Sequence, residues 1–265
     1  MRLPRVPIAM TAIGAAIAVV VNMSGTASPT ASADPALPPC PQGAALISPS
    51  ATSPHVDCRL HSGVLDMSVT YWRVPELPTP GAVKVVVTDP SGVVVQTIDE
   101  LLEPSSPTGV GLQDIDGDGH DELIIPIARR SFNGGPNTRF SVWRAPGDRL
   151  HYERTQMVGQ AAYPSGDGYL VLNSGALDSR DLTFYLPTGA GYTLVVTITI
   201  EAEQVDPDTH RVLTVHCRAH QEDGLHAIDM ELRQAEDTFC ASPAANAIWP
   251  GAERIAIRNR PNVGT

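Results

Sequence analysis

From about residue 63 onward the chain consists of short β-type runs, and this pattern limits the available folds more than any other feature. The runs read VLDMSVTYWRV, AVKVVV, VVVQTI, ELIIPIA, RFSVWRA, YLVLN, LTFYL, YTLVVTITIEA, RVLTVHCRA and LHAIDMELR. Turn-forming Gly, Pro, Asn and Asp residues separate many of them, as in DPSG, NGGP and PGD. Runs spaced in this way predict an all-β antiparallel fold. Their number and length fit a propeller-like meander, with a β-sandwich as the alternative.

The strongest strand pattern lies at residues 192–201. One face of this strand is predicted to carry Tyr192, Leu194, Val196, Ile198 and Ile200. The residues between them are threonines, with Val195 as the exception. This period of two is typical of a half-buried strand. Pairing with Arg211–Ala219 across the VDPDTH turn predicts a long hairpin.

The first 33 residues have the order of a cleaved secretory signal peptide. Two arginines and no acid precede an apolar run from Ile8 to Val21, and small residues follow up to Ala31-Ser32-Ala33. The run holds 14 residues, whereas a membrane-spanning helix needs about 20. We therefore expect cleavage before Asp34, no stable membrane insertion, and a secreted or cell-envelope location.

Removal of the leader leaves enough chain for one sizeable core. Residues 34–62 are rich in proline and loop-like, and residues 63–265 are expected to form a single β domain. At most one short C-terminal helix is predicted, around Gln234–Ala245. Pro243 limits its length, because proline removes a backbone hydrogen bond inside a helix.

Four cysteines remain after cleavage: Cys40, Cys58, Cys217 and Cys240. An even number of cysteines in an exported chain indicates disulfides, and four cysteines allow three pairings. The pairing predicted here is the sequence-local one, Cys40–Cys58 and Cys217–Cys240. It would fasten the two ends of the domain.

The chain is strongly acidic, with a formal charge of −11 that becomes −13 once the leader takes Arg2 and Arg5 away. An acidic surface repels nucleic acids and anionic lipids, so neither is expected as a partner. It suits cations or a basic extracytoplasmic protein.

The segment DIDGDGHDE, residues 114–122, has the spacing of a calcium-binding loop. The expected ligands are the carboxylates of Asp114, Asp116, Asp118 and Glu122 and the backbone carbonyl of His120. Carboxylates at positions 1, 3 and 5 converge when the chain curls round an ion, and Gly119 at position 6 permits the sharp turn. Position 12 is Ile125, where an EF-hand has Glu, and a β-type run follows directly. We therefore predict Ca²⁺ bound in a loop between strands.

DIDGDGHDELII resembles the loop of FG-GAP and VCBS-type modules, as found in integrin-like propellers. Together with VVVQTI and SFNGGPNTRFSVWRA, it resembles a group of small bacterial exported proteins related to periplasmic lysozyme inhibitors and to immunity proteins against peptidoglycan hydrolases. The resemblance covers about residues 83–145 and implies a propeller-like fold, the calcium ligands given above, and a lysozyme-like hydrolase as partner. This chain has one such loop where integrin-like chains carry several, and no inhibitory residue can be assigned.

The sequence favours a protein that acts by binding rather than an enzyme. It contains no G-x-S-x-G elbow and no H-E-x-x-H motif. A carboxylate pair for glycan hydrolysis can be drawn from Asp178, Asp181, Glu201 and Glu203, which keeps a glycan-active hydrolase as one alternative. A cell-surface adhesion or carbohydrate-binding module is the other.

Overall fold

The structure is a computed structural model that describes residues 37–41, 53–77, 79–106, 108–132, 135–145, 150–189 and 191–255. These residues belong to one compact unit, assigned to Ala31–Thr265. The predicted leader, residues 1–33, lies outside the described residues. Within the described ranges, no helix is long and apolar enough to cross a membrane.

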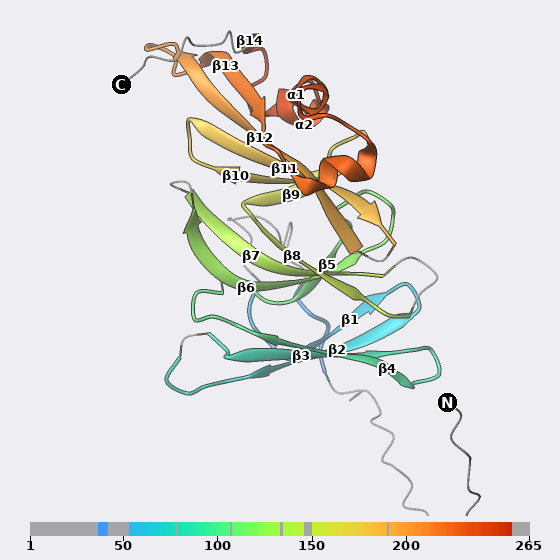
Figure 1. The fold of residues 1–265 in the computed structure, drawn as a ribbon. Helices are drawn as coiled ribbons and strands as arrows, with labels where there is room; N and C mark the ends of the chain where they lie inside the picture. The colour runs from blue at the N-terminus through green and yellow to red at the C-terminus, as the bar shows by residue number, and fades with distance from the viewer. Residues whose placement is uncertain are drawn as a thin grey trace, which may run out of the picture. The chain divides into compact units, whose positions relative to one another are not determined.

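The described strands form three sheets, and within each sheet the strands lie side by side in chain order (Figure 1). Sheet A contains β1 (Cys58–Ser62), β2 (Leu65–Trp72), β3 (Ala82–Thr88) and β4 (Val94–Leu101). Sheet B contains β5 (Gly111–Gln113), β6 (Glu122–Phe132), β7 (Gly135–Arg144) and β8 (Glu153–Gly159). Sheet C contains β9 (Ala161–Pro164), β10 (Leu170–Gly175), β11 (Ser179–Thr188), β12 (Gly191–Val205), β13 (Val212–Ala219) and β14 (Glu253–Ile255). Neighbouring strands pair antiparallel except β13 and β14, which are parallel, so the predicted all-β antiparallel fold is confirmed.

Sheet B supplies side chains to two separate cores. Leu123 and Ile125 of β6 belong to the buried cluster formed by sheet A. Ile124, which lies between them in sequence, joins a second cluster together with Leu170 and Leu172 of sheet C. Successive side chains of a strand point to opposite faces, so one apolar strand can serve both neighbours. This explains why the ELIIPIA run is continuously apolar.

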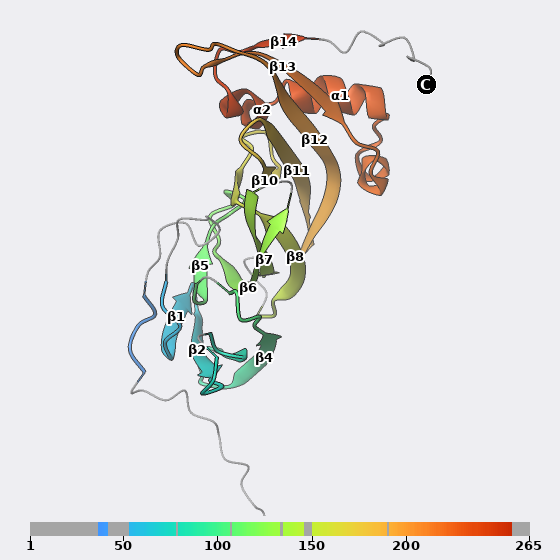
Figure 2. The same cartoon turned by 90° about the vertical axis from the view of Figure 1, so that its left-hand side faces the viewer.

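Three short helical elements cover the other face of sheet C: η1 (Asp223–Ile228), α1 (Leu232–Cys240) and α2 (Pro243–Ile248). Helix α1 packs beside β12 and β13 (Figure 2). Its Phe239 ring lies 4.7 Å from the ring of Phe184 in β11, measured between centroids. Apolar side chains from the helices and from sheet C therefore form the third core.

The helical region differs from the prediction in two ways. The predicted single helix around Gln234–Ala245 is two α-helices, because Pro243 occupies the first turn of α2 instead of limiting α1. Proline suits that position, since its φ is already helical and its missing N–H needs no partner there. The run LHAIDMELR was predicted as β-type but forms the end of η1 and the beginning of α1.

The hairpin predicted from residues 192–201 and 211–219 is confirmed by the pairing of β12 with β13. The predicted single apolar face of β12 is wrong, however, because the register with β11 shifts at Val195. Such a β-bulge leaves one residue without a cross-strand partner and moves the following side chains to the opposite face. Tyr192 and Leu194 accordingly pack between sheets B and C, whereas Val196, Ile198 and Ile200 face the helices.

Both predicted disulfides are confirmed, Cys40–Cys58 and Cys217–Cys240. The first fastens residues 37–41 to β1, which begins five residues before the predicted start of the β domain. The second fastens the end of α1 to β13. Two disulfides fit a protein that matures in an oxidising compartment.

Candidate metal centre

The segment between β5 and β6, residues 114–121, curls around the side chain of Asp114. The two carboxylate oxygens of Asp114 accept backbone N–H groups from Gly117 at 2.7 Å and from Gly119 at 3.0 Å. Both glycines have positive φ, 77° and 87°, which glycine adopts without the steric cost that other residues meet. The sequence therefore forms the sharp loop that the Asp and Gly spacing predicts.

Three of the four predicted carboxylate ligands converge at this loop. Asp114, Asp116 and Glu122 each offer an oxygen, and these oxygens lie within 4.8 Å of one another. The side chains of Asp116 and Glu122 are each only 1% exposed. Glu122 is held in place by the backbone N–H of Ile115, which donates to its Oε2 at 3.1 Å. These three side chains could hold a metal ion.

Asp118 and His120 have other contacts in the loop. The Asp118 carboxylate accepts the backbone N–H of His120 at 2.8 Å and a guanidinium N–H of Arg144 at 2.6 Å. Asp118 therefore faces Arg144 and is not one of the three converging carboxylates.

Arg144 is the main component of the site that sequence analysis missed. Its Nε lies 3.1 Å from Asp116 Oδ2 and 3.7 Å from Glu122 Oε1. Its Nη1 donates to the carbonyl of Gly189, next to β12, at 2.9 Å. The pairing of β6 with β7 aligns Leu123 with Trp143 and so brings Arg144 beside Glu122. No local sequence signal marks this arginine, because its role depends on the strand register.

Tyr192 is the second component that the sequence did not reveal. Its hydroxyl donates to Asp116 Oδ2 at 3.0 Å, and its ring centroid lies 5.5 Å from the Arg144 guanidinium carbon. Together, Arg144 and Tyr192 connect the loop of sheet B to sheet C. With the four acids ionised, the single guanidinium leaves a net charge of −3, which a divalent cation would largely neutralise.

The protonation of Glu122 reflects this environment. Burial raises the pKa of the Glu122 carboxyl to about 8, and the nearby carboxylates of Asp116 and Asp118 act in the same direction. The N–H of Ile115 opposes the shift. Burial also raises the pKa of the Tyr192 hydroxyl, with Glu122 and Asp116 adding to the effect. Without a cation, Glu122 is therefore mostly neutral at pH 7.

The metal-free protein is expected to lose stability as the pH rises from 4.5 toward 8. The folded state retains a proton on Glu122 that the unfolded state releases near its ordinary pKa of 4.5, so this contribution is complete below pH 4.5 and lost above about 8. Unfolding measured in chelator between pH 5 and 8.5 checks this. The slope of the unfolding free energy against pH should be smaller in Glu122→Gln, because the glutamine side chain has the same shape but cannot ionise. A slope equal to that of the native chain would contradict the assignment to Glu122.

The four acids considered for glycan hydrolysis lie on or beside β11 and β12. Glu203 contacts His216 at 3.3 Å and Glu201 lies 4.0 Å from Arg218, and both pairs lie near the surface of sheet C. Asp181 accepts a hydrogen bond from Thr199 at 2.7 Å. These three acids therefore pair with polar or basic side chains on neighbouring strands.

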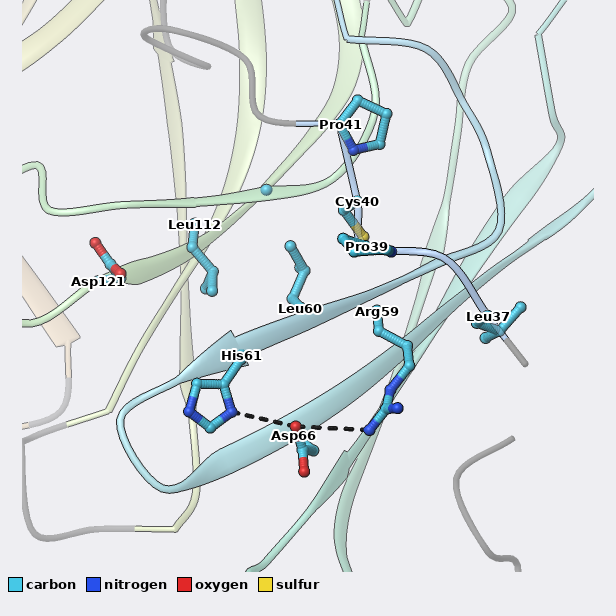
Figure 3. A pocket seen from close by; sticks show the side chains of 11 residues that line it. Leu37, Pro39, Cys40, Pro41, Arg59, Leu60, His61, Asp66, Leu112 and Asp121 are labelled. Atoms are coloured by element: carbon cyan, nitrogen blue, oxygen red, sulfur yellow. Dashed lines mark hydrogen bonds and ion pairs between the residues drawn. The ribbon is translucent and has the colours of Figure 1, made fainter. Parts of the chain in front are cut away.

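A pocket of about 730 Å³ lies near the metal loop, between residues 37–41, the β1–β2 hairpin and β5 (Figure 3). Its polar lining comprises Arg59, His61, Asp66 and Asp121, the last of which directly precedes Glu122. Asp66 Oδ1 lies 3.2 Å from His61 Nδ1 and 3.8 Å from Arg59 Nη2. The sequence did not indicate this pocket, because its walls come from distant segments.

No family model matches the chain, and no curated protein matches it. Among solved structures, the chain is similar to a Xanthomonas type IV secretion system related protein, with 18% identity and a TM-score of 0.40. The match covers 63% of this chain and 90% of the other. Similarity at this level carries no functional inference, so function is inferred below from the residues themselves.

Proposed function

We propose that this chain is an exported calcium-binding β protein that acts by binding another protein, with a basic, lysozyme-like cell-wall hydrolase as its partner. The observation that supports the metal is the convergence of Asp114, Asp116 and Glu122, whose oxygens lie within 4.8 Å of one another. Buried carboxylates that approach this closely are stabilised by a cation.

Calcium suits this site better than magnesium. The candidate donors are all oxygens, and they belong to an irregular loop between strands instead of an octahedral cage. Ca²⁺ takes about six to eight oxygen ligands, so Asp118 and the His120 carbonyl are the proposed additional donors. Because Arg144 and Tyr192 connect the loop to sheet C, the ion would support the contact between sheets B and C.

Export is supported by the predicted leader and by the two disulfides. The choice of a basic partner rests on charge. Loss of Arg2 and Arg5 with the leader takes the formal charge from −11 to −13. Such a surface accelerates encounter with a basic protein at low ionic strength. The lysozyme-like class of partner rests on the resemblance of residues 83–145.

Binding of the mature chain, residues 34–265, to a basic lysozyme tests this proposal. We expect inhibition of peptidoglycan lysis and an association rate that falls at least tenfold between about 50 and 500 mM salt, since salt screens long-range attraction. The matched control is a lysozyme with acetylated lysines, which retains its fold with less positive charge. Absence of both binding and inhibition at low salt, with calcium present, would rule out this partner.

The pocket of about 730 Å³ favours a carbohydrate-binding module as the second candidate. Arg59, His61 and Asp66 place charged and polar groups beside the apolar Leu60 and Leu112, a combination found in ligand sites. Binding of soluble peptidoglycan fragments should then be insensitive to salt and weakened by His61→Ala. Release of reducing sugar from those fragments would instead identify a glycan-active hydrolase.

A further inference from the structure

A second pocket, of about 430 Å³, lies at the C-terminal edge of sheet C. Its lining includes Ile200 of β12 and Val215 of β13, which are almost fully buried, and Trp249 and Pro250, which follow α2. These apolar side chains of the strands belong to the third core, so the pocket is continuous with a well-packed region. Its size is that of a small-molecule site, and its lining combines apolar side chains with polar groups such as Asn246.

One charged side chain, Arg254, lines this pocket from the edge strand β14. Arg254 lies opposite Val215 in the β13–β14 ladder, and its Nη2 donates to Asn246 Oδ1 of α2 at 3.0 Å. Its Nη1 is buried and has no hydrogen-bond partner. A buried donor without a partner is unfavourable, so this nitrogen is suited to an acceptor from a ligand.

Among the described residues, no acidic side chain forms an ion pair with Arg254. Burial lowers the pKa of its guanidinium, with no nearby carboxylate opposing the shift. In a chain with a formal charge of −11, a pocket-lining arginine without such a partner is an informative exception.

A second arginine lies close to Gly251, which is part of the pocket lining. A Cβ placed on Gly251 would lie only 3.0 Å from Nη2 of Arg211. Arg211 is exposed and has no partner in the ion pairs of the described chain. Of these two guanidinium groups, that of Arg254 lines the pocket.

We propose that this pocket binds a small organic carboxylate with an apolar body. The carboxylate would accept N–H groups from Arg254, whose planar guanidinium matches it in a two-point contact. The apolar body would lie against Trp249 and Pro250. This site uses neither the metal loop nor the acidic surface, so it is independent of the function proposed above.

An inward-pointing charge on an edge strand can also have a role other than ligand binding. It discourages pairing with the edge strand of another sheet. That role requires charge at Arg254 but no ligand. Direct binding to the folded protein therefore separates the two roles.

The probe for this test is 4-phenylbutyrate, compared with its uncharged amide by calorimetric titration of the mature protein. We expect the amide to bind at least tenfold more weakly, because it cannot provide a charged acceptor to Arg254. Arg254→Gln should weaken 4-phenylbutyrate at least tenfold, while Arg233→Gln should leave it unchanged. Arg233 is the matched control, since it is exposed on α1 and its replacement removes the same charge.

Equal affinities for the acid and the amide would overturn the proposal. A titration that shows no heat of binding at 4-phenylbutyrate concentrations on the order of 10 mM would overturn it as well. An unchanged affinity in Arg254→Gln would overturn the assigned role of Arg254. Should that variant fail to fold, the comparison of acid with amide on the native chain still decides the question.

Discussion

Removal of calcium is expected to lower the melting temperature of this protein by about 5–10 °C. A bound metal at 100 times its dissociation constant stabilises a fold by about 2.7 kcal/mol, and about 1 kcal/mol corresponds to 2–4 °C for a domain of this size. The reason is that Asp114 and Asp116 lose the cation that offsets their repulsion, while Glu122 has to take up a proton in place of the ion. Thermal unfolding in chelator, in millimolar calcium and in millimolar magnesium measures the effect.

Two variants make this measurement specific. Glu122→Gln should reduce the response to chelator, because it removes one buried ligand charge and preserves the side-chain volume. Asp121→Asn is the matched control, since this neighbouring acid is exposed and does not belong to the converging group. Identical melting curves of the native chain with calcium and with chelator, together with no heat on calcium titration, would refute the metal centre.

Asp116→Ala should behave differently from Glu122→Gln. Asp116 accepts hydrogen bonds from both Arg144 and Tyr192, so its loss should destabilise the metal-free protein as well. Arg144 keeps its contacts with Asp118 and Gly189, but loss of one charged partner of a buried arginine carries a cost of its own. A stability loss seen only in calcium would mean that the contacts of Asp116 with Arg144 and Tyr192 contribute nothing without the ion.

Removal of the Cys217–Cys240 disulfide is expected to cost about 2–4 kcal/mol of unfolding free energy. This bridge closes a loop with a sequence separation of 23 and fastens α1 to β13. Its loss increases the conformational entropy of the unfolded chain and removes the covalent link between sheet C and the helices that cover it. Urea unfolding of the Cys217→Ser, Cys240→Ser double variant measures the change.

Hydrogen exchange locates the effect of that double variant. Amides of α1 and α2 should exchange faster, while those of sheet A retain their protection, because sheet A belongs to a different core. The double variant Cys40→Ser, Cys58→Ser is the control and should leave α1 unaffected. Unchanged exchange in α1 after loss of Cys217–Cys240 would show that packing alone holds the helix.

Features that depend on neighbouring sequence could be predicted. The β-strands follow from local alternation, and the β12–β13 hairpin follows from two strands joined by a short turn. The disulfides also join cysteines that are close in sequence. The metal loop belongs to this group, because one nine-residue segment, 114–122, supplies all its proposed carboxylates.

Features that depend on register or on distant packing could not be predicted. Val195 shifts the register of β12, and a single unpaired residue leaves little trace in an apolar run. Arg144 contacts the metal loop only when β6 pairs with β7, and Tyr192 only when sheet C packs against sheet B. Arg254 reaches its pocket only when β14 pairs with β13. Because these residues are far in sequence from the residues they contact, no local sequence pattern reveals the contacts.

The order of strands within the sheets has a consequence for how the chain folds. Sheets A and B, and β9 to β13 of sheet C, pair each strand with its immediate neighbour in sequence, so little loop entropy opposes each step. Such a topology permits the sheets to form one after another from the N-terminal side, each offering an apolar face to the next. Strand β14 is the exception, since it joins β13 across the intervening helices. Its docking, with closure of the Arg254 pocket, is therefore expected as the last step of folding.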